Sequence, residues 1–257
     1  MEHGQVKWGR PRDDVYGPYN HTIAQAGSHN QHTQQPIVTG SSVLGIKFDK
    51  GVIVAADNLA SYGSLARFTD QERLFTVGKQ TVVGIGGDIS DLQRVGEILD
   101  QLEIQENYDS DGHELKAKHV FKYLKNVFYN RRNKMDPLWN ATLVGGLTDE
   151  GKPFLAYVDL LGVSYTAPCL ATGFGAHMAL PLMRKVVDRD GDEENLTEER
   201  ARALLEQCLQ VLHYRDGRSS DKYSIATITQ AGIKFDQGLK LPVGNWKFAK
   251  DLEIDAL

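Results

Sequence analysis

A single carboxylate, Asp57, ends an apolar run of the sequence, Gly-Val-Ile-Val-Ala-Ala-Asp over residues 51–57. The run shows no polar alternation, which predicts a strand covered on both faces. A carboxylate at the end of such a strand is costly to bury unless it is paired or takes part in chemistry. Asp57 is therefore either a satisfied turn carboxylate beside Asn58 or part of a functional site.

The residues ahead of this run place it in a β-hairpin. A second apolar run covers residues 43–48, and Asp49-Lys50-Gly51 connects the two. We expect Gly51 to supply the positive φ that a tight hairpin turn needs. A Gly40-Ser41-Ser42 junction stands directly before the first run, so the candidate chemistry lies where the chain enters these two strands.

Hydrophobic periodicity predicts further strands and two pairs of helices. The order is strands, two helices, strands, two helices and strands, which favours one α+β domain with antiparallel sheets. A basic cluster, Arg131-Arg132-Asn133-Lys134, follows the second helix and is either a solvated helix end or a site for an anion or partner. The other expected strands cover residues 74–77, 81–87, 139–146, 153–160, 163–167, 223–229 and 233–235, and the expected helices cover residues 90–102, 115–129, 176–187 and 197–212.

Composition narrows the class of protein. The 257 residues are 41% apolar, enough for a full core, and carry a net charge of −5 with acidic and basic residues mixed. We therefore expect neither a nucleic-acid nor a membrane partner. Cys169 and Cys208 lack metal-ligand spacing and are interpreted as buried thiols of a reducing compartment, with no metal or cofactor. No run resembles a signal peptide or a membrane span, so an intracellular, soluble protein is expected.

Both ends of the chain differ from its middle. Residues 1–32 carry too little apolar surface to fold alone, and we interpret them as a leader that is disordered in isolation. Residues 238–257 extend past the last predicted hairpin with Trp246 and Leu252 at helical spacing. These ends flank one predicted domain of about residues 33–240.

Four motifs occur in order: Gly-Val-Ile-Val-Ala-Ala-Asp, Gly-Gly-Asp at 86–88, Ala-Thr-Gly-x-Gly-Ala at 171–176 and Tyr-Arg-Asp-x-Arg-Ser-Ser at 214–220. Together they resemble the proteasome β-subunit family over about residues 33–240. The resemblance implies a four-layer αββα sandwich of the N-terminal-nucleophile hydrolase type. Segments 62–67, 135–140 and 160–165 resemble, within that family, the non-catalytic subunit at the seventh ring position.

Active members of the family remove a propeptide after a glycine, and the exposed threonine attacks the peptide carbonyl with help from its own α-amino group. In this chain the nucleophile position falls on Ser41, preceded by Gly40. The resemblance matches Asp57 to the carboxylate beside the catalytic lysine. It matches Gly87 to the glycine whose backbone N–H stabilises the oxyanion.

The resemblance further matches Asp216 and Ser219 to the pair that brackets the nucleophile's amine. Three positions depart from the active pattern: Ser41 replaces threonine, Arg73 stands at the lysine position, and Phe174 replaces a small hydroxyl residue. Arginine keeps the charge but is never deprotonated in proteins, so it cannot shuttle a proton. We therefore interpret seven positions as a vestigial site without a catalytic residue: Ser41, Asp57, Arg73, Gly87, Phe174, Asp216 and Ser219.

The implied function is a non-catalytic structural β subunit of the 20S core particle. It would help form the inner ring and chamber wall for ATP- and ubiquitin-dependent protein degradation, in cytoplasm and nucleus. An active serine-type peptidase, with Ser41 attacking and Arg73 lowering the amine's pKa, is the alternative. A lone amidohydrolase of the same fold is a third. Thr39 is a poorer nucleophile candidate because Val38, not glycine, precedes it.

The resemblance also gives the two chain ends a role. The leader is expected to be trimmed by an active neighbour near Gln31, His32 and Thr33. The expected partners are the other α and β subunits, in two stacked seven-membered β rings between α rings. Residues 241–257 are expected to reach a β subunit of the opposite ring, with an aromatic and apolar set as anchors: Trp246, Phe248 and Leu252.

Overall fold

The computed structural model describes residues 34–109, 112 and 114–244. The expected leader, its cleavage region at Gln31 to Thr33, and the anchors Trp246, Phe248 and Leu252 lie outside the described residues. In chain order the elements are β1 (Val38–Gly40), β2 (Val43–Phe48), β3 (Gly51–Asp57), β4 (Ala60–Tyr62), β5 (Leu65–Phe68), β6 (Leu74–Val77), β7 (Thr81–Asp88), α3 (Ile89–Asp109), α4 (Ala117–Asn133), β8 (Asn140–Leu147), β9 (Pro153–Asp159), β10 (Ser164–Thr166), β11 (Cys169–Ala171), α5 (Gly175–Met178), α6 (Leu180–Arg184), η1 (Asp192–Asn195), α7 (Glu198–Arg215), β12 (Lys222–Thr229) and β13 (Gly232–Lys240).

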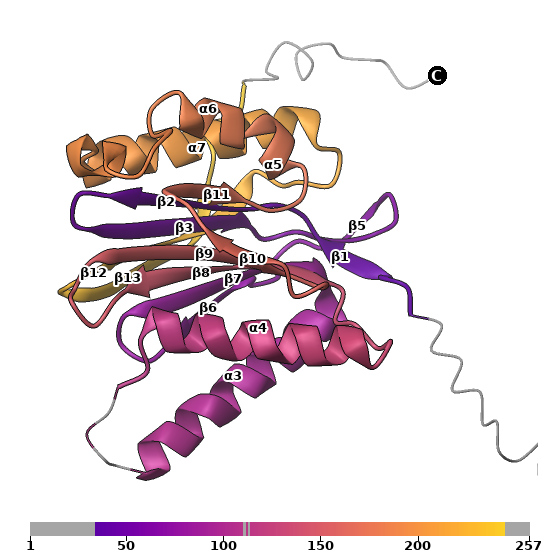
Figure 1. Ribbon diagram of the computed structural model, residues 1–257. Helices are drawn as coiled ribbons and strands as arrows, with labels where there is room; N and C mark the ends of the chain where they lie inside the picture. The colour runs from indigo at the N-terminus through magenta and orange to yellow at the C-terminus, as the bar shows by residue number, and fades with distance from the viewer. Residues whose placement is uncertain (1–33, 110–111, 113, 245–257) are drawn as a thin grey trace, which may run out of the picture. The chain divides into compact units, whose positions relative to one another are not determined.

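Two antiparallel sheets pack face to face, with helices on both outer sides (Figure 1). The larger sheet has the order β10-β9-β8-β7-β1-β4-β5, with β6 also pairing with β7, and α3 and α4 cover it. The smaller sheet has the order β11-β2-β3-β12-β13, and α5, α6 and α7 cover it. These four layers confirm the predicted αββα sandwich.

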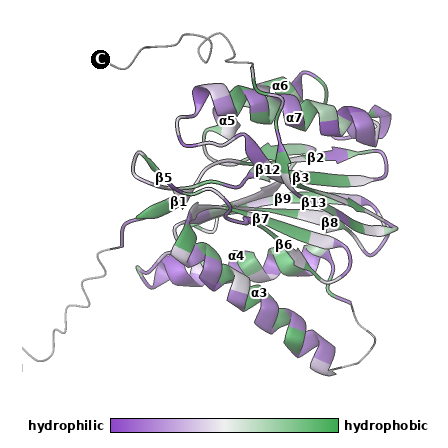
Figure 2. Ribbon diagram, turned by 180° about the vertical axis from the view of Figure 1, so that it is seen from behind, coloured by the Kyte–Doolittle hydropathy of each residue, from purple (hydrophilic) through white to green (hydrophobic). Residues whose placement is uncertain are grey.

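Strand β3 shows why the sequence folds into four layers. All seven of its residues are buried, as the continuous apolar run predicts. Val52 and Val54 face the apolar layer between the two sheets, whereas Ile53 and Ala55 face the cluster beneath α7. Figure 2 shows the same arrangement, with mainly green or white strands in the interior and purple on the helices. The strand therefore needs a cover on each side.

Glycine at position 51 serves a different purpose from the predicted one. Gly51 is the first residue of β3 and does not have a positive φ. A Cβ there would lie 1.9 Å from the backbone oxygen of Ile228, on the neighbouring strand β12. The glycine is therefore required by close backbone approach rather than by the hairpin turn.

The helix expected over residues 176–187 is interrupted. It forms the two short helices α5 and α6, which separate at Ala179. Pro181 stands in the first turn of α6, where its missing N–H is tolerated, but it cannot continue a helix that began before it. Strands β1, β4, β5 and β11, each three or four residues long, were not expected. None of the described helices is long and apolar enough to cross a membrane.

Cys169 and Cys208 are buried free thiols, as predicted. Burial raises the pKa of Cys169 to about 11 and that of Cys208 to about 12. Thiolate, the reactive form, is therefore scarce at pH 8, and both sulfurs are sheltered from reagents. We expect no reaction of either thiol with a disulfide reagent at pH 8 in the native full chain, and reaction of both in urea. Rapid labelling of either cysteine without denaturant would contradict the described packing.

Candidate functional site

Strand β1 carries the chain from one sheet to the other at the predicted nucleophile. It lies between β4 and β7 in the larger sheet, and the next strand, β2, belongs to the smaller one. Gly40 pairs with Gly87 on one side and Ala60 on the other. The residues directly ahead of Ser41 are therefore an integral strand with a partner on each edge.

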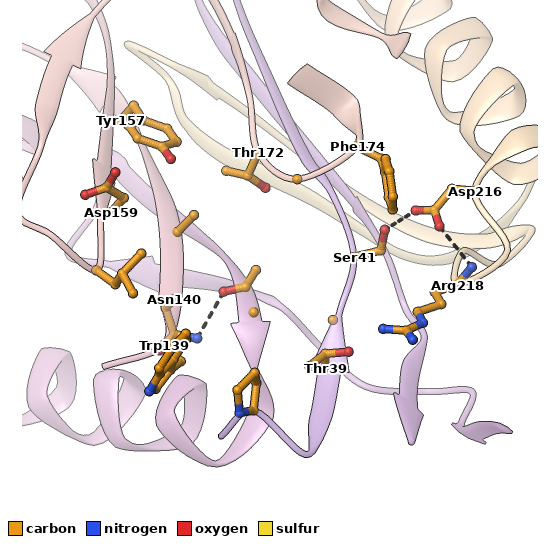
Figure 3. A pocket seen from close by; sticks show the side chains of 17 residues that line it. Thr39, Ser41, Trp139, Asn140, Tyr157, Asp159, Thr172, Phe174, Asp216 and Arg218 are labelled. Atoms are coloured by element: carbon orange, nitrogen blue, oxygen red, sulfur yellow. Dashed lines mark hydrogen bonds between the residues drawn. The ribbon is translucent and has the colours of Figure 1, made fainter. Parts of the chain in front are cut away.

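The Ser41 hydroxyl is directed at Asp216. The hydroxyl donates a hydrogen bond to the Asp216 carboxylate, and the second oxygen of that carboxylate accepts from the backbone N–H of Arg218 at 2.9 Å (Figure 3). The C-terminal end of α7 positions Asp216, whose N–H donates to the Leu212 carbonyl at 2.7 Å. Two of the predicted site residues are thus in direct contact.

Ser219, the second residue predicted to bracket the amine, has another role here. Its hydroxyl is 2.9 Å from the carbonyl oxygen of Leu212 and 2.8 Å from that of Asp216. Both acceptors belong to the end of α7, where carbonyl groups lack helical partners. Ser219 therefore caps a helix and positions Asp216, and its hydroxyl forms no hydrogen bond with the Ser41 hydroxyl.

Arg73 is the most unusual buried side chain of the site, with 1% of its surface exposed. Its guanidinium has five N–H donors, and all five find acceptors. Nε donates to the Asp57 carbonyl at 2.9 Å, and Nη1 to the carbonyls of Ser41 at 2.8 Å and Ile85 at 3.4 Å. Nη2 donates to the Ser42 carbonyl at 2.8 Å and to the Asp57 carboxylate. One side chain therefore joins β3, β7 and the β1–β2 connection.

Asp57 is the counter-ion in this network. Burial raises its pKa above the usual value, while the Arg73 guanidinium and the Ser220 backbone N–H, 3.1 Å away, oppose that rise. Its neighbour Asn58 instead accepts a hydrogen bond from Ser224 at 3.0 Å. The sequence left open whether Asp57 is a satisfied carboxylate or part of the candidate site. In the structure it is both, because its hydrogen-bond partners belong to the site.

Gly40 has a packing reason of its own. A Cβ at this position would lie 2.6 Å from Cδ of Arg73. Glycine is therefore the residue that lets the β1 backbone pass over the buried arginine. The Gly40-Ser41 junction, taken from sequence as a possible cleavage signal, is explained by this contact without any cleavage.

A pocket of about 380 Å³ opens beside Ser41. Gly87 lies in its wall with φ of +95°, and a Cβ there would be 2.2 Å from the Trp139 carbonyl oxygen. Phe174 lies close to Ser41 and Asp216, across the pocket from Trp139 and Asn140, with 56% of its surface exposed (Figure 3). The remaining lining is mainly apolar. The pocket thus brings Ser41, Gly87, Phe174 and Asp216 together.

Several pocket residues were not predicted: Trp139, Asn140, Tyr157, Asp159 and Arg218. Asn140 is the most informative, because it is buried and its amide nitrogen donates to the carbonyls of Gly86 at 3.0 Å and Asp88 at 2.9 Å. It fixes the end of β7 that holds Gly87. The only indication of this role in the sequence was an asparagine at the start of a mainly apolar strand. Among the described residues, no group of three His, Cys, Asp or Glu could hold a metal ion.

Comparison with known proteins decides the family. The family model described as "Proteasome subunit" matches residues 37–228, most of the chain. The chain belongs to the proteasome subunit family. The match covers all four motifs on which the predicted resemblance rested, and it confirms that resemblance.

Curated relatives place the chain among the β subunits of the family. It is 51% identical to "Proteasome subunit beta type-7" of Saccharomyces cerevisiae, over 98% of this chain and 97% of the relative. It is 47% identical to "Proteasome subunit beta type-4" of Xenopus laevis, over 85% and 88%, and 40% identical to the type-4 subunit of Dictyostelium discoideum, over 95% and 91%. The relatives thus carry two different type numbers.

Loss of the Arg73 guanidinium should strongly destabilise the fold. Arg73→Met leaves Asp57 buried without its counter-ion, which typically costs about 3–5 kcal/mol. As a control, Arg94→Met removes only an exposed pair with Glu97 and should cost less than about 1 kcal/mol. Urea unfolding of the full chain measures both. Equal losses in the two variants would show that the buried network contributes no special stability.

Proposed function

We propose that this chain is a non-catalytic structural subunit of the 20S proteasome core, at the seventh position of a β ring. Its work would be to form part of the inner ring and of the chamber wall. The engagement of Arg73 carries the proposal: the residue at the position of the catalytic lysine has every donor occupied by structural acceptors. A guanidinium held this way has no donor left to act on a nucleophile and cannot release a proton.

The path of the chain ahead of Ser41 supports the same proposal. A free α-amino group at Ser41 would require cleavage of the bond between Gly40 and Ser41. Residues Val38–Gly40 are hydrogen-bonded to β4 and β7, so they occupy the place between these strands. An extended substrate would have to displace this strand, with its paired backbone groups, before it could lie against Gly87.

One observation favours the alternative, an active serine-type peptidase. The Ser41 hydroxyl is bonded to the Asp216 carboxylate, which is an arrangement of a nucleophile with a base. That carboxylate also accepts from the Arg218 N–H at 2.9 Å, so part of its acceptor capacity is already used to hold the turn after α7. Phe174 additionally crowds the approach to Ser41. We therefore place this alternative second.

The remaining parts of the proposal concern assembly. The leader would be trimmed by an active neighbour ahead of Thr33, which would leave β1 in the chamber wall. Residues 241–257 would contact a β subunit of the opposite ring, and the particle would work in cytoplasm and nucleus. Inter-subunit surface rather than a pocket would then carry the function.

Substitution of Ser41 tests the proposal directly. We expect particles that carry Ser41→Ala to hydrolyse all standard peptide substrates at the wild-type rate per particle, because no reaction depends on this hydroxyl. Ser42→Ala is the matched control for loss of a hydroxyl in the same connection, since Ser42 accepts from the Gly175 N–H at 2.8 Å. Selective loss of one peptidase activity in the Ser41 variant alone would favour the alternative.

The N-terminus of the subunit in purified particles gives an independent result. A start upstream of β1, near Thr33, is expected if a neighbour trims the leader. A start at Ser41 would mean that the strand ahead of it had been removed by cleavage after Gly40. Intact mass and N-terminal sequencing distinguish the two.

A further inference from the structure

The pocket beside Ser41 has two chemically different ends. Figure 3 shows Trp139, Tyr157 and Asp159 on one side of the pocket, and Asp216 and Arg218 on the other. The second side belongs to the candidate site described above. Trp139, Tyr157 and Asp159, which we call the β9 end of the pocket, are outside the seven positions that the resemblance singles out, so their role is a separate question.

The register of β8 and β9 explains how this end is built. Tyr157 and Asp159 are two residues apart on β9, so their side chains leave the same face of the sheet. The residue paired with Asp159 on β8 is Ala141, whose side chain is small. Ala141 and Trp139, just ahead of β8, also line the pocket. The β9 end is therefore held by two paired strands.

Asp159 brings a carboxylate without a cationic partner. Its Oδ1 accepts hydrogen bonds from the backbone N–H groups of Leu161 and Val163, both at 3.0 Å, which holds the turn after β9. Among the described residues, no lysine, arginine or histidine forms an ion pair with it, and its Oδ2 accepts no hydrogen bond. A half-buried carboxylate with one oxygen free can accept from a cation that enters the pocket.

Two aromatic rings accompany this carboxylate. Burial raises the pKa of Tyr157 to about 12, and nearby Asp159 and Tyr165 add to the rise. The phenol is therefore neutral at pH 7, and the negative charge at this end comes from Asp159. The faces of tyrosine and tryptophan rings attract organic cations, which makes Tyr157 and Trp139 suitable neighbours for one.

The charge balance of the whole lining favours a cation over an anion. The pocket is lined by two carboxylates, Asp159 and Asp216, and by one guanidinium, that of Arg218. Arg218 is exposed and lies on the side away from Asp159 (Figure 3). An anion at the β9 end would therefore meet a carboxylate without a cation beside it. The remaining lining is mainly apolar, and about 380 Å³ is enough for a small ligand.

We propose that the β9 end of the pocket binds an ammonium or guanidinium group carried on a short apolar stem. The cation would contact Asp159 and the ring faces of Trp139 and Tyr157, and the stem would fill the apolar part of the pocket. Two sources offer this chemistry: a lysine or arginine side chain of a peptide, and a free small amine. The site uses residues of this chain alone and goes beyond the proposed structural role.

Ligand-observed NMR titration of the purified full chain tests the proposal. The probes are N-acetyl-lysine amide, which mimics a peptide side chain, and n-pentylammonium, a free amine. We expect saturable binding of at least one, and which of them binds identifies the source. N-acetyl-norleucine amide keeps the stem without the charge and should bind at least about tenfold more weakly than its lysine counterpart. No saturable binding of either cation, equal binding of the norleucine compound, or tighter binding of pentanoate would overturn the proposal.

Variants locate the binding. Asp159→Asn keeps an oxygen for the turn after β9 but removes the charge, and should weaken cation binding at least about fivefold. Asp149→Asn makes the same change in net charge at an exposed turn between β8 and β9, and should bind as the wild type does. Equal affinity of these two variants would refute the site.

A second pair of variants decides the result if Asp159→Asn does not fold. Tyr157→Leu removes the ring and should weaken cation binding about threefold, whereas Tyr157→Phe keeps the ring face and should retain the affinity. Equal affinity of the leucine and phenylalanine variants would contradict the contribution of the ring.

This proposal and the proposed function fail in different ways. If the chain does not co-purify with other proteasome subunits, the structural role is wrong, while cation binding by the chain alone is unaffected. If the chain co-purifies but neither cation binds, only the ligand site is wrong.

Discussion

A buried guanidinium governs the architecture around the candidate site. Removing a cation from water costs several kcal/mol, and such a group is tolerated only with a counter-ion and with its other donors satisfied. Arg73 meets that demand with the Asp57 carboxylate and the carbonyls of Asp57, Ser41, Ser42 and Ile85. These acceptors belong to strands of both sheets and to the connection between them. The junction of the two sheets is therefore built on one side chain.

Close packing accounts for both glycines of the site, and at Gly40 the buried guanidinium side chain is the cause. Gly40 must lack a side chain because Arg73 lies beneath it, and Gly87 must lack one because the Trp139 carbonyl lies beside it. Two glycines that the resemblance assigns to cleavage and to oxyanion binding thus also have steric roles in this chain. A glycine at such a position is therefore weak evidence for or against activity, whereas a side chain that must supply chemistry, such as the residue at position 73, is stronger evidence.

Much of this fold was predictable because its long elements carry clear periodicity. The hairpin of β2 and β3, the central strands β7 and β8 and the helices α3, α4 and α7 all bury apolar residues at regular spacing. Strand β1 could not be found this way, since its three residues are held by pairing with β4 and β7, which are distant in sequence. Strands β4 and β5 form a short local hairpin with no apolar run of its own. The reason for glycine at position 51 could not be predicted either, because it depends on how closely the backbone of β12 approaches β3.

The candidate site was predictable in its residues but not in its connections. The resemblance indicated Ser41, Asp57, Gly87 and Asp216, and it placed Arg73 at the position of the lysine. The use of every Arg73 donor depends on contacts across 12 to 32 residues of sequence, and the capping of α7 by Ser219 on contacts across 3 and 7 residues. Periodicity carries no information on such contacts, because the Arg73 contacts are set by how the two sheets meet and the Ser219 contacts by the turn after α7. A residue that matches a motif can therefore have partners that the motif does not indicate, and only the geometry of its hydrogen bonds shows what those partners are.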